Sequence, residues 1–416
     1  MNKRKKILFV HQNFPAQYKH IYRALIEEGH EVHSLSIRKY NDSIMKNHHY
    51  NLSGSSTEGI NEWTVEFESK MIRAESAAKK ALEIKENGFY PDLIIGHPGW
   101  GETFFLKEIW PETKLLSYVE FYYKTKDCDV DFDKDFVESV LKRDFDSFYN
   151  YTRLKLTARN APFLASYSTS DFLVCPTEYQ KSLVPSPIRE GIEVIHDGID
   201  TDTLKPNDEV TITINKRKFN KDDEIVTYIS RSLDPYRGFH IFMRSLPEVM
   251  GNNPNANIFI VGGKETHGYG APLKEGNFKD FFLDEIKDKI DMSRIFFLDF
   301  LEYSSYIRVL QISTVHIYLT YPFVLSWSML EAMSCEALII GSKTDPVTEV
   351  ITDNKTGLLI DFFDISGLSK KITKVLKNKD NFIKIRKNAR KKIIQDYDLK
   401  NTCLPAHLAL INKALK

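Results

Sequence analysis

The stretch from Tyr321 to Ser342, YPFVLSWSMLEAMSCEALIIGS, constrains the fold of this chain more than any other. After a short loop, apolar residues recur at helical spacing at Met329, Leu330 and Met333. The apolar run 337–340 is then typical of a strand buried on both faces. We expect a loop, a helix and a strand of a parallel α/β sheet. Free N–H groups and the positive end of the helix dipole face such a loop and favour anion binding.

The segment SMLEAMSCEALIIGS resembles the E-A-M-A-C-G-x-P-V-V-A-S motif of family 4 glycosyltransferases. That resemblance implies the α/β GT-B fold, with two Rossmann-like doubly wound domains facing across a cleft. It also implies that Glu331 holds the ribose hydroxyls of a nucleotide-sugar donor. Local sequence offers an alternative, because Ser328-x-x-Glu331 is also a capping box in which the glutamate reaches back to the helix cap.

The stretch departs from the family motif at two positions. Phe323 stands where the family carries a second glutamate, and Glu336 replaces the glycine that usually ends the helix. Upstream, residues 257–263 form an apolar strand that ends in Val-Gly-Gly. The resemblance places the donor against Gly263, Phe323, Val324, Leu325, Ser326, Ser328 and Glu331.

The length and the charge of the chain limit the classes of protein to which it can belong. A chain of 416 residues exceeds one ordinary core and predicts two domains. Fifty-seven basic and fifty-seven acidic residues cancel, which disfavours nucleic acid as a partner. The four cysteines are far apart, and this spacing favours neither a metal site nor a disulfide framework. The basic start, residues 1–6, precedes too short an apolar run for a signal peptide, so we expect a cytoplasmic protein without a transmembrane span.

The first half begins with a strand at 6–11, a helix at 16–28 and a strand at 31–37, which is a βαβ start. The turn HQNFPAQ contains no G-x-G-x-x-G, so a nicotinamide cofactor is disfavoured. This turn resembles that of a bacterial subgroup of family 4. The resemblance puts the acceptor near Phe14, Pro15, Gln17, Trp100 and Glu120.

A histidine, His97, follows the strand 92–96 in the sequence HPGWGE. Parallel sheets bind ligands at the carboxyl ends of their strands. The family carries a histidine here near the reacting sugar, whereas a histidine after a strand can also be purely structural. Both interpretations stay open.

Two charged segments of the first half are interpreted as solvent-exposed and not as functional sites. The helix 66–87 carries Lys70, Arg73 and further lysines mixed with glutamates, which indicates a solvated face. Weak membrane-surface association is the alternative. The loop from Asp127 to Asp133 lacks the glycine and glutamate of a calcium loop, so we expect a solvated acidic loop and no metal site.

Arg231 and Arg237 lie six positions apart between a predicted strand and a predicted helix. Two cations at a helix N-terminus suit a pyrophosphate. The family has an arginine and a lysine at this spacing, and the alternative is two exposed loop arginines. The candidate catalytic residues are therefore His97, Arg231, Arg237 and Glu331.

These patterns predict domains at 1–196 and 224–396 joined by a linker at 197–223. The resemblance implies that the first domain binds the acceptor, that the second binds the donor, and that 397–416 is a terminal helix that crosses back to the first domain. By resemblance, the protein transfers a sugar from a UDP or GDP sugar to a glycan, lipid-linked, protein or small-molecule acceptor. It does so with retention, and without metal or cofactor. A non-catalytic nucleotide-sugar binding partner and a sugar-nucleotide epimerase are the alternatives.

Overall fold

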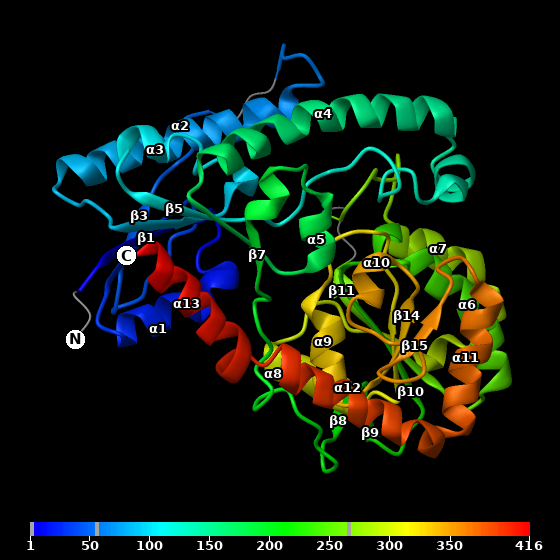
Figure 1. Cartoon of the computed structure of the whole chain (residues 1–416). Coiled ribbons are helices and arrows are strands. Elements are labelled where there is room, and N and C mark those ends of the chain that lie inside the picture. The colour runs from blue at the N-terminus through cyan, green and yellow to red at the C-terminus, as the bar shows by residue number, and fades with distance from the viewer. Residues whose placement is uncertain (1–3, 55–57, 264–267) are drawn as a thin grey trace. The chain divides into compact units, whose positions relative to one another are not determined.

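The computed structural model describes residues 4–54, 58–263 and 268–416. Residues 1–3 of the basic start and 55–57 of the region before the long helix lie outside the described residues. The chain forms two compact units, each a parallel sheet between helices (Figure 1). Unit 1 comprises residues 1–125, 149–198 and 400–416, and unit 2 comprises residues 126–148 and 199–399. The expectation of two Rossmann-like α/β domains is confirmed.

Unit 1 is built on a seven-stranded parallel sheet of order β3-β2-β1-β4-β5-β6-β7. Its strands are β1 (Lys6–Val10), β2 (Glu31–Ser36), β3 (Lys46–His49), β4 (Leu93–Gly96), β5 (Lys114–Tyr118), β6 (Phe172–Cys175) and β7 (Ile192–Val194). Its helical segments are η1 (Ala16–Lys19), α1 (Ile21–Glu27), α2 (Val65–Glu86), η2 (Pro98–Trp100), α3 (Leu106–Ile109), most of α4 (Phe145–Thr169), α5 (Glu178–Leu183), η4 (Ile188–Gly191) and α13 (Leu404–Ala414).

Alternation along β1 divides the core of unit 1 into two layers. Ile7 and Phe9 pack with α1 and α13, whereas Leu8 and Val10 pack with α2 and α3. Helices therefore cover both faces of the sheet (Figure 1), which explains why its strands are apolar runs instead of alternating patterns. His97 directly follows β4, so it lies at the end of the sheet where the carboxyl ends of the parallel strands meet.

Unit 2 repeats the plan with a six-stranded parallel sheet of order β12-β11-β10-β13-β14-β15. Its strands are β10 (Ile225–Ser232), β11 (Asn257–Gly263), β12 (Ile295–Phe297), β13 (Val315–Tyr318), β14 (Leu338–Ser342) and β15 (Leu358–Ile360). Its longer helices are α6 (Phe239–Asn252), α7 (Phe278–Ile286), α8 (Tyr303–Ile312), α9 (Trp327–Ser334), α11 (Ile365–Lys377) and α12 (Ile383–Asp396). Short segments are the π-helix η3 (Phe136–Val140), η5 (Pro235–Arg237), η6 (Lys287–Lys289), η7 (Met292–Arg294), α10 (Asp345–Thr348), η8 (Lys379–Phe382) and η9 (Leu399–Cys403), whose last four residues belong to unit 1.

Two segments differ from the predicted boundaries. Residues 126–148 belong to unit 2, although they fall inside the predicted first domain. The predicted linker is packed: it forms a hairpin of β8 (Ile212–Ile214) and β9 (Arg217–Phe219), and Leu204 and Val210 are buried in the core of unit 2. In each segment, apolar side chains are buried against residues that are distant in the sequence. The polar composition of the segment does not indicate this packing.

Among the described residues, no helix is both long and apolar enough to cross a membrane.

Candidate functional site

The loop before α9 presents unpaired backbone donors. The N–H groups of Val324 and Leu325 have no hydrogen-bond partner among the described residues. Ser326 caps α9, because its hydroxyl accepts from the N–H of Ser328 at 3.3 Å, and its own N–H donates to the Tyr318 hydroxyl at 2.7 Å. Free donors beside a helix N-terminus are the arrangement that an anion requires.

Glu331 is not the capping residue that the local pattern suggested. Because Ser326 is the cap, Glu331 lies too far along α9 to reach back to it. Its carboxylate instead accepts hydrogen bonds from the hydroxyls of Tyr303, at 3.1 Å, and Tyr306, both on α8. Burial raises the pKa of Glu331, and the two tyrosine hydrogen bonds oppose that shift. No sequence pattern indicated these tyrosines, which lie more than twenty residues away in the chain.

Arg237 is buried, not an exposed loop arginine. Its Nη1 donates to the Thr320 hydroxyl at 2.9 Å and to the Val324 carbonyl at 2.8 Å, on the loop that carries the free N–H groups. Its guanidinium carbon also lies 5.7 Å from the centroid of the Phe323 ring and 5.5 Å from that of Tyr269. Arg237 therefore holds the candidate anion loop in place by hydrogen bonds and puts a positive charge behind it.

Arg231 and Gly263 lie at neighbouring strand ends. Arg231 is exposed near the end of β10, and its guanidinium group makes no hydrogen bond or ion pair with another described residue. Gly263 ends β11, where an added Cβ would come within 2.8 Å of the Phe300 ring. Phe323, which replaces the family glutamate, is buried between the rings of Tyr236 and Tyr269, with centroids 5.4 and 4.6 Å away. The Phe323 ring packs at this position and carries no charge.

The acidic loop is only partly solvated, because Asp127 is exposed while Asp129 and Asp133 are buried. Asp133 is buried in unit 2, where it accepts from His240 Nε2 at 3.0 Å, the Tyr321 hydroxyl at 2.7 Å and the Phe136 N–H at 2.9 Å. Asp129 is also buried and accepts from the Tyr236 hydroxyl at 2.9 Å. Burial alone would raise the pKa of Asp133, but the hydrogen bonds hold it below its usual value. Among the described residues, no group of three or more His, Cys, Asp or Glu side chains is arranged to hold a metal ion.

In unit 1, His97 is buried at the carboxyl end of β4. Its Nδ1 accepts the Gly99 N–H at 3.2 Å, so the ring proton is on Nε2, which lies 3.3 Å from the Glu120 carboxylate. The ring stacks on Tyr118 with centroids 5.6 Å apart. This fixes one tautomer and directs one polar atom toward the loop after β5.

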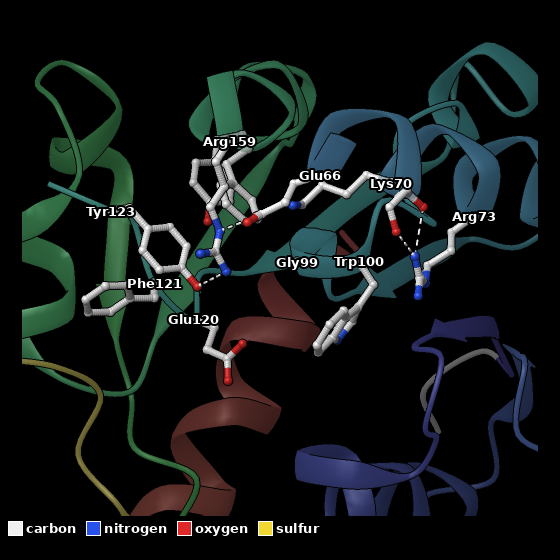
Figure 2. Close-up of a pocket in the computed structure, with 12 residues that line it drawn as sticks. Glu66, Lys70, Arg73, Gly99, Trp100, Glu120, Phe121, Tyr123 and Arg159 are labelled. Atoms are coloured by element: carbon white, nitrogen blue, oxygen red, sulfur yellow. Dashed lines mark hydrogen bonds and ion pairs between the residues drawn. The ribbon is translucent and has the colours of Figure 1, made fainter. Parts of the chain in front are cut away.

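The predicted acceptor-side residues divide into two groups. Phe14 is fully buried in the core of unit 1 and packs against Phe9 and Tyr22, so its side chain supports the turn and does not face a ligand. Pro15 and Gln17 are half-buried in the same turn. Trp100 and Glu120, in contrast, line one cavity of unit 1 (Figure 2).

The chain is similar to known glycosyltransferase families and to a curated glycosyltransferase. Two family models match it in tandem: Glycosyl transferase family 4 group over residues 28–204, and Glycosyl transferases group 1 over residues 210–392. D-inositol 3-phosphate glycosyltransferase of Mycobacterium sp. (strain JLS) is 22% identical over 186 residues, which are 44% of this chain. The match spans 39% of that relative's length.

Solved structures with similar folds include three bacterial proteins. Sucrose-phosphate synthase of Thermosynechococcus elongatus has a TM-score of 0.74 at 14% identity and covers 99% of both chains. A glycosyltransferase of Rickettsia africae has 0.67 at 16%, covering 100% of this chain and 99% of its own. Anabaena HepE in complex with UDP-glucose has 0.64 at 14%, covering 99% and 100%. At these identities the likeness concerns the fold. Together with the two consecutive family matches, each over less than half of the chain, it gives this chain the GT-B fold and makes it similar to glycosyltransferases of family 4.

Proposed function

We propose that the chain transfers a hexosyl unit from a UDP or GDP sugar to an acceptor bound by unit 1, with retention of the anomeric configuration. The observation that carries this is the loop before α9, where the N–H groups of Val324 and Leu325 are free, together with Glu331 on α9, whose carboxylate is held by two tyrosines. The loop suits a diphosphate and the carboxylate suits ribose hydroxyls. The similar fold of HepE, solved with UDP-glucose, supports a donor of this class.

Stabilisation of the diphosphate leaving group is the main electrostatic demand of such a transfer. Unit 2 offers the loop N–H groups, the buried charge of Arg237 and the exposed charge of Arg231. We propose that these groups serve without a metal ion. In unit 1, the resemblance assigns His97 to the reacting sugar, and a sugar hydroxyl that displaces the Glu120 carboxylate would accept the Nε2 proton.

Nucleotide binding and turnover of the full chain test this proposal. Purified protein would be titrated with UDP, GDP and their sugars, and Glu331→Gln compared with the exposed control Glu302→Gln. We expect one nucleotide to bind, and Glu331→Gln to weaken its binding while the control does not. If no nucleotide or nucleotide sugar binds the folded protein, the proposal is wrong.

Product analysis separates the alternatives. Transfer with the anomeric configuration kept, followed by NMR, supports a retaining transferase. Conversion of the donor sugar to an epimer would identify an epimerase. Donor binding with neither transfer nor hydrolysis, over a broad set of acceptors, would identify a non-catalytic binding protein.

A further inference from the structure

Unit 1 encloses a cavity of about 260 Å³ between α2, the loop after β4, the loop after β5 and α4 (Figure 2). Cationic side chains come from two helices, and an exposed indole comes from η2. Figure 2 shows Trp100 and Glu120 extending into the same space beneath Arg159, Glu66 and Lys70. The residues that bear on its chemistry are Glu66, Lys70, Arg73, Trp100, Glu120 and Arg159.

Two of the cations have no carboxylate partner. Lys70 is only 8% exposed, and no described carboxylate lies within 4.0 Å of its ammonium group. Its contact is the face of the Phe163 ring, at 5.0 Å from the centroid. Arg73 donates from Nη1 to the carbonyl and hydroxyl of Ser69, while its Nε has no hydrogen-bond partner among the described residues. The Nε donor of Arg73 is therefore unused.

The carboxylates nearby are held by other groups. Glu66 pairs with Arg159 Nε at 2.7 Å, and Glu120 lies 3.3 Å from His97 Nε2. Glu102 is fully buried, accepts from the Tyr50 hydroxyl at 3.1 Å, and has its pKa raised by burial. None of them forms an ion pair with Lys70 or Arg73. The cavity, as far as the described residues go, has an excess of positive charge.

This imbalance affects Lys70 directly. Burial, and then the charge of Arg159, lower the pKa of its amine to about 8, although Glu66 opposes the shift. A buried amine without a counter-ion destabilises a fold unless a ligand supplies the missing charge. A surface lysine would extend its amine into water instead.

The backbone holds Lys70 in this position. Gly101, at φ 106°, packs against the Lys70 carbonyl so closely that a Cβ would lie 2.3 Å from the oxygen. On the other side, Asn160 of α4 is hydrogen-bonded to both the N–H and the carbonyl of Tyr123, whose ring stacks under the Arg159 guanidinium at 3.8 Å. The cavity wall is thus formed before any ligand binds.

We propose that this cavity binds the acceptor through an anionic group, a phosphate or a carboxylate, which Lys70 and Arg73 hold while Trp100 packs on an adjoining sugar ring. This rests on the proposed transferase function. Arginine binds both kinds of group through two parallel N–H donors, and lysine adds a point charge. An exposed indole is a good surface for the apolar face of a sugar.

Binding of simple probes in the absence of any donor tests the proposal. Ligand-detected NMR titrations of the full chain would compare glucose 6-phosphate, glucuronate and glucose. We expect at least one anionic probe to bind about tenfold or more tightly than glucose. Lys70→Met should abolish that preference. Lys79→Met, at an exposed position of α2 where the lysine pairs with Glu75 at 2.6 Å, should keep it.

The comparison of phosphate with carboxylate identifies which group the site prefers. Equal or absent binding of all three probes would overturn the proposal, as would an anion preference that survives in Lys70→Met. If Lys70→Met does not fold, Arg73→Gln and Lys70→Arg take its place: the first should lose the preference and the second should retain it. Because UDP and GDP binding to unit 2 is measured separately, failure here is distinct from failure of the transferase proposal.

Discussion

Asp133→Ala should destabilise unit 2 strongly, although the sequence around this residue predicts a solvated loop. The substitution removes the acceptor for three buried donors: His240 Nε2, the Tyr321 hydroxyl and the Phe136 N–H. Hydrogen bonds to a charged group contribute roughly 1.5–3 kcal/mol each, and burying a carboxylate offsets part of that gain. The pKa of Asp133 is held below its ordinary value, which indicates that the hydrogen bonds outweigh the burial.

We therefore expect a loss of about 3–5 kcal/mol of unfolding free energy, the range found when one partner of a buried pair is removed. For a unit of this size the loss corresponds to a fall in Tm on the order of 10 °C. Urea and thermal unfolding of the full chain measure it, and limited proteolysis locates the loosened segment within 126–148. The matched control is Asp135→Ala, two residues on, where the side chain is exposed and caps nothing. If both variants unfold alike, within about 0.5 kcal/mol, the buried network does not stabilise the unit as argued.

Four further outcomes follow from the described contacts. Tyr306→Phe removes a hydrogen bond from Glu331, raises its pKa further and should weaken nucleotide binding several-fold in a calorimetric titration, whereas the exposed Tyr90→Phe should not. Arg237→Ala removes the hydrogen bonds to Thr320 and Val324, and the fall in kcat/KM should correspond to a loss of about 2–4 kcal/mol of transition-state stabilisation. Arg237→Lys should recover part of this loss, and normal turnover of a folded Arg237→Ala protein would disprove the assignment. Binding of glucose 6-phosphate should be strongest near pH 7, where its phosphate, with a second pKa of about 6, is a dianion and Lys70 is charged. It should weaken as the pH rises through 8, because Lys70 has a pKa of about 8 when free and a higher one with an anion bound; a flat profile from pH 7 to 10 would contradict this. Transfer should survive a chelator, and loss of turnover that manganese or magnesium restores would show a metal requirement.

Several features of the chain could be predicted from the sequence because they depend on local patterns. The apolar run 337–340 and the helical spacing before it predicted β14 and α9 in the right order. The chain length predicted two domains and the first strands and helices predicted a βαβ start, while the resemblance to family 4 implied that both domains are Rossmann-like. His97 was expected at the carboxyl end of a strand, and it lies there.

The tertiary structure decided which charged groups are buried and what they contact. A helical pattern does not show that Lys70 and Arg73 turn inward, because the face of α2 that receives them is covered by α4 and by the loop at Gly101. Likewise, Asp133 looks solvated until His240 and Tyr321 are brought to it from more than a hundred residues away. A buried charge needs partners, and those partners come from distant parts of the chain, so local sequence indicates the spacing of charged residues while the fold determines their surroundings.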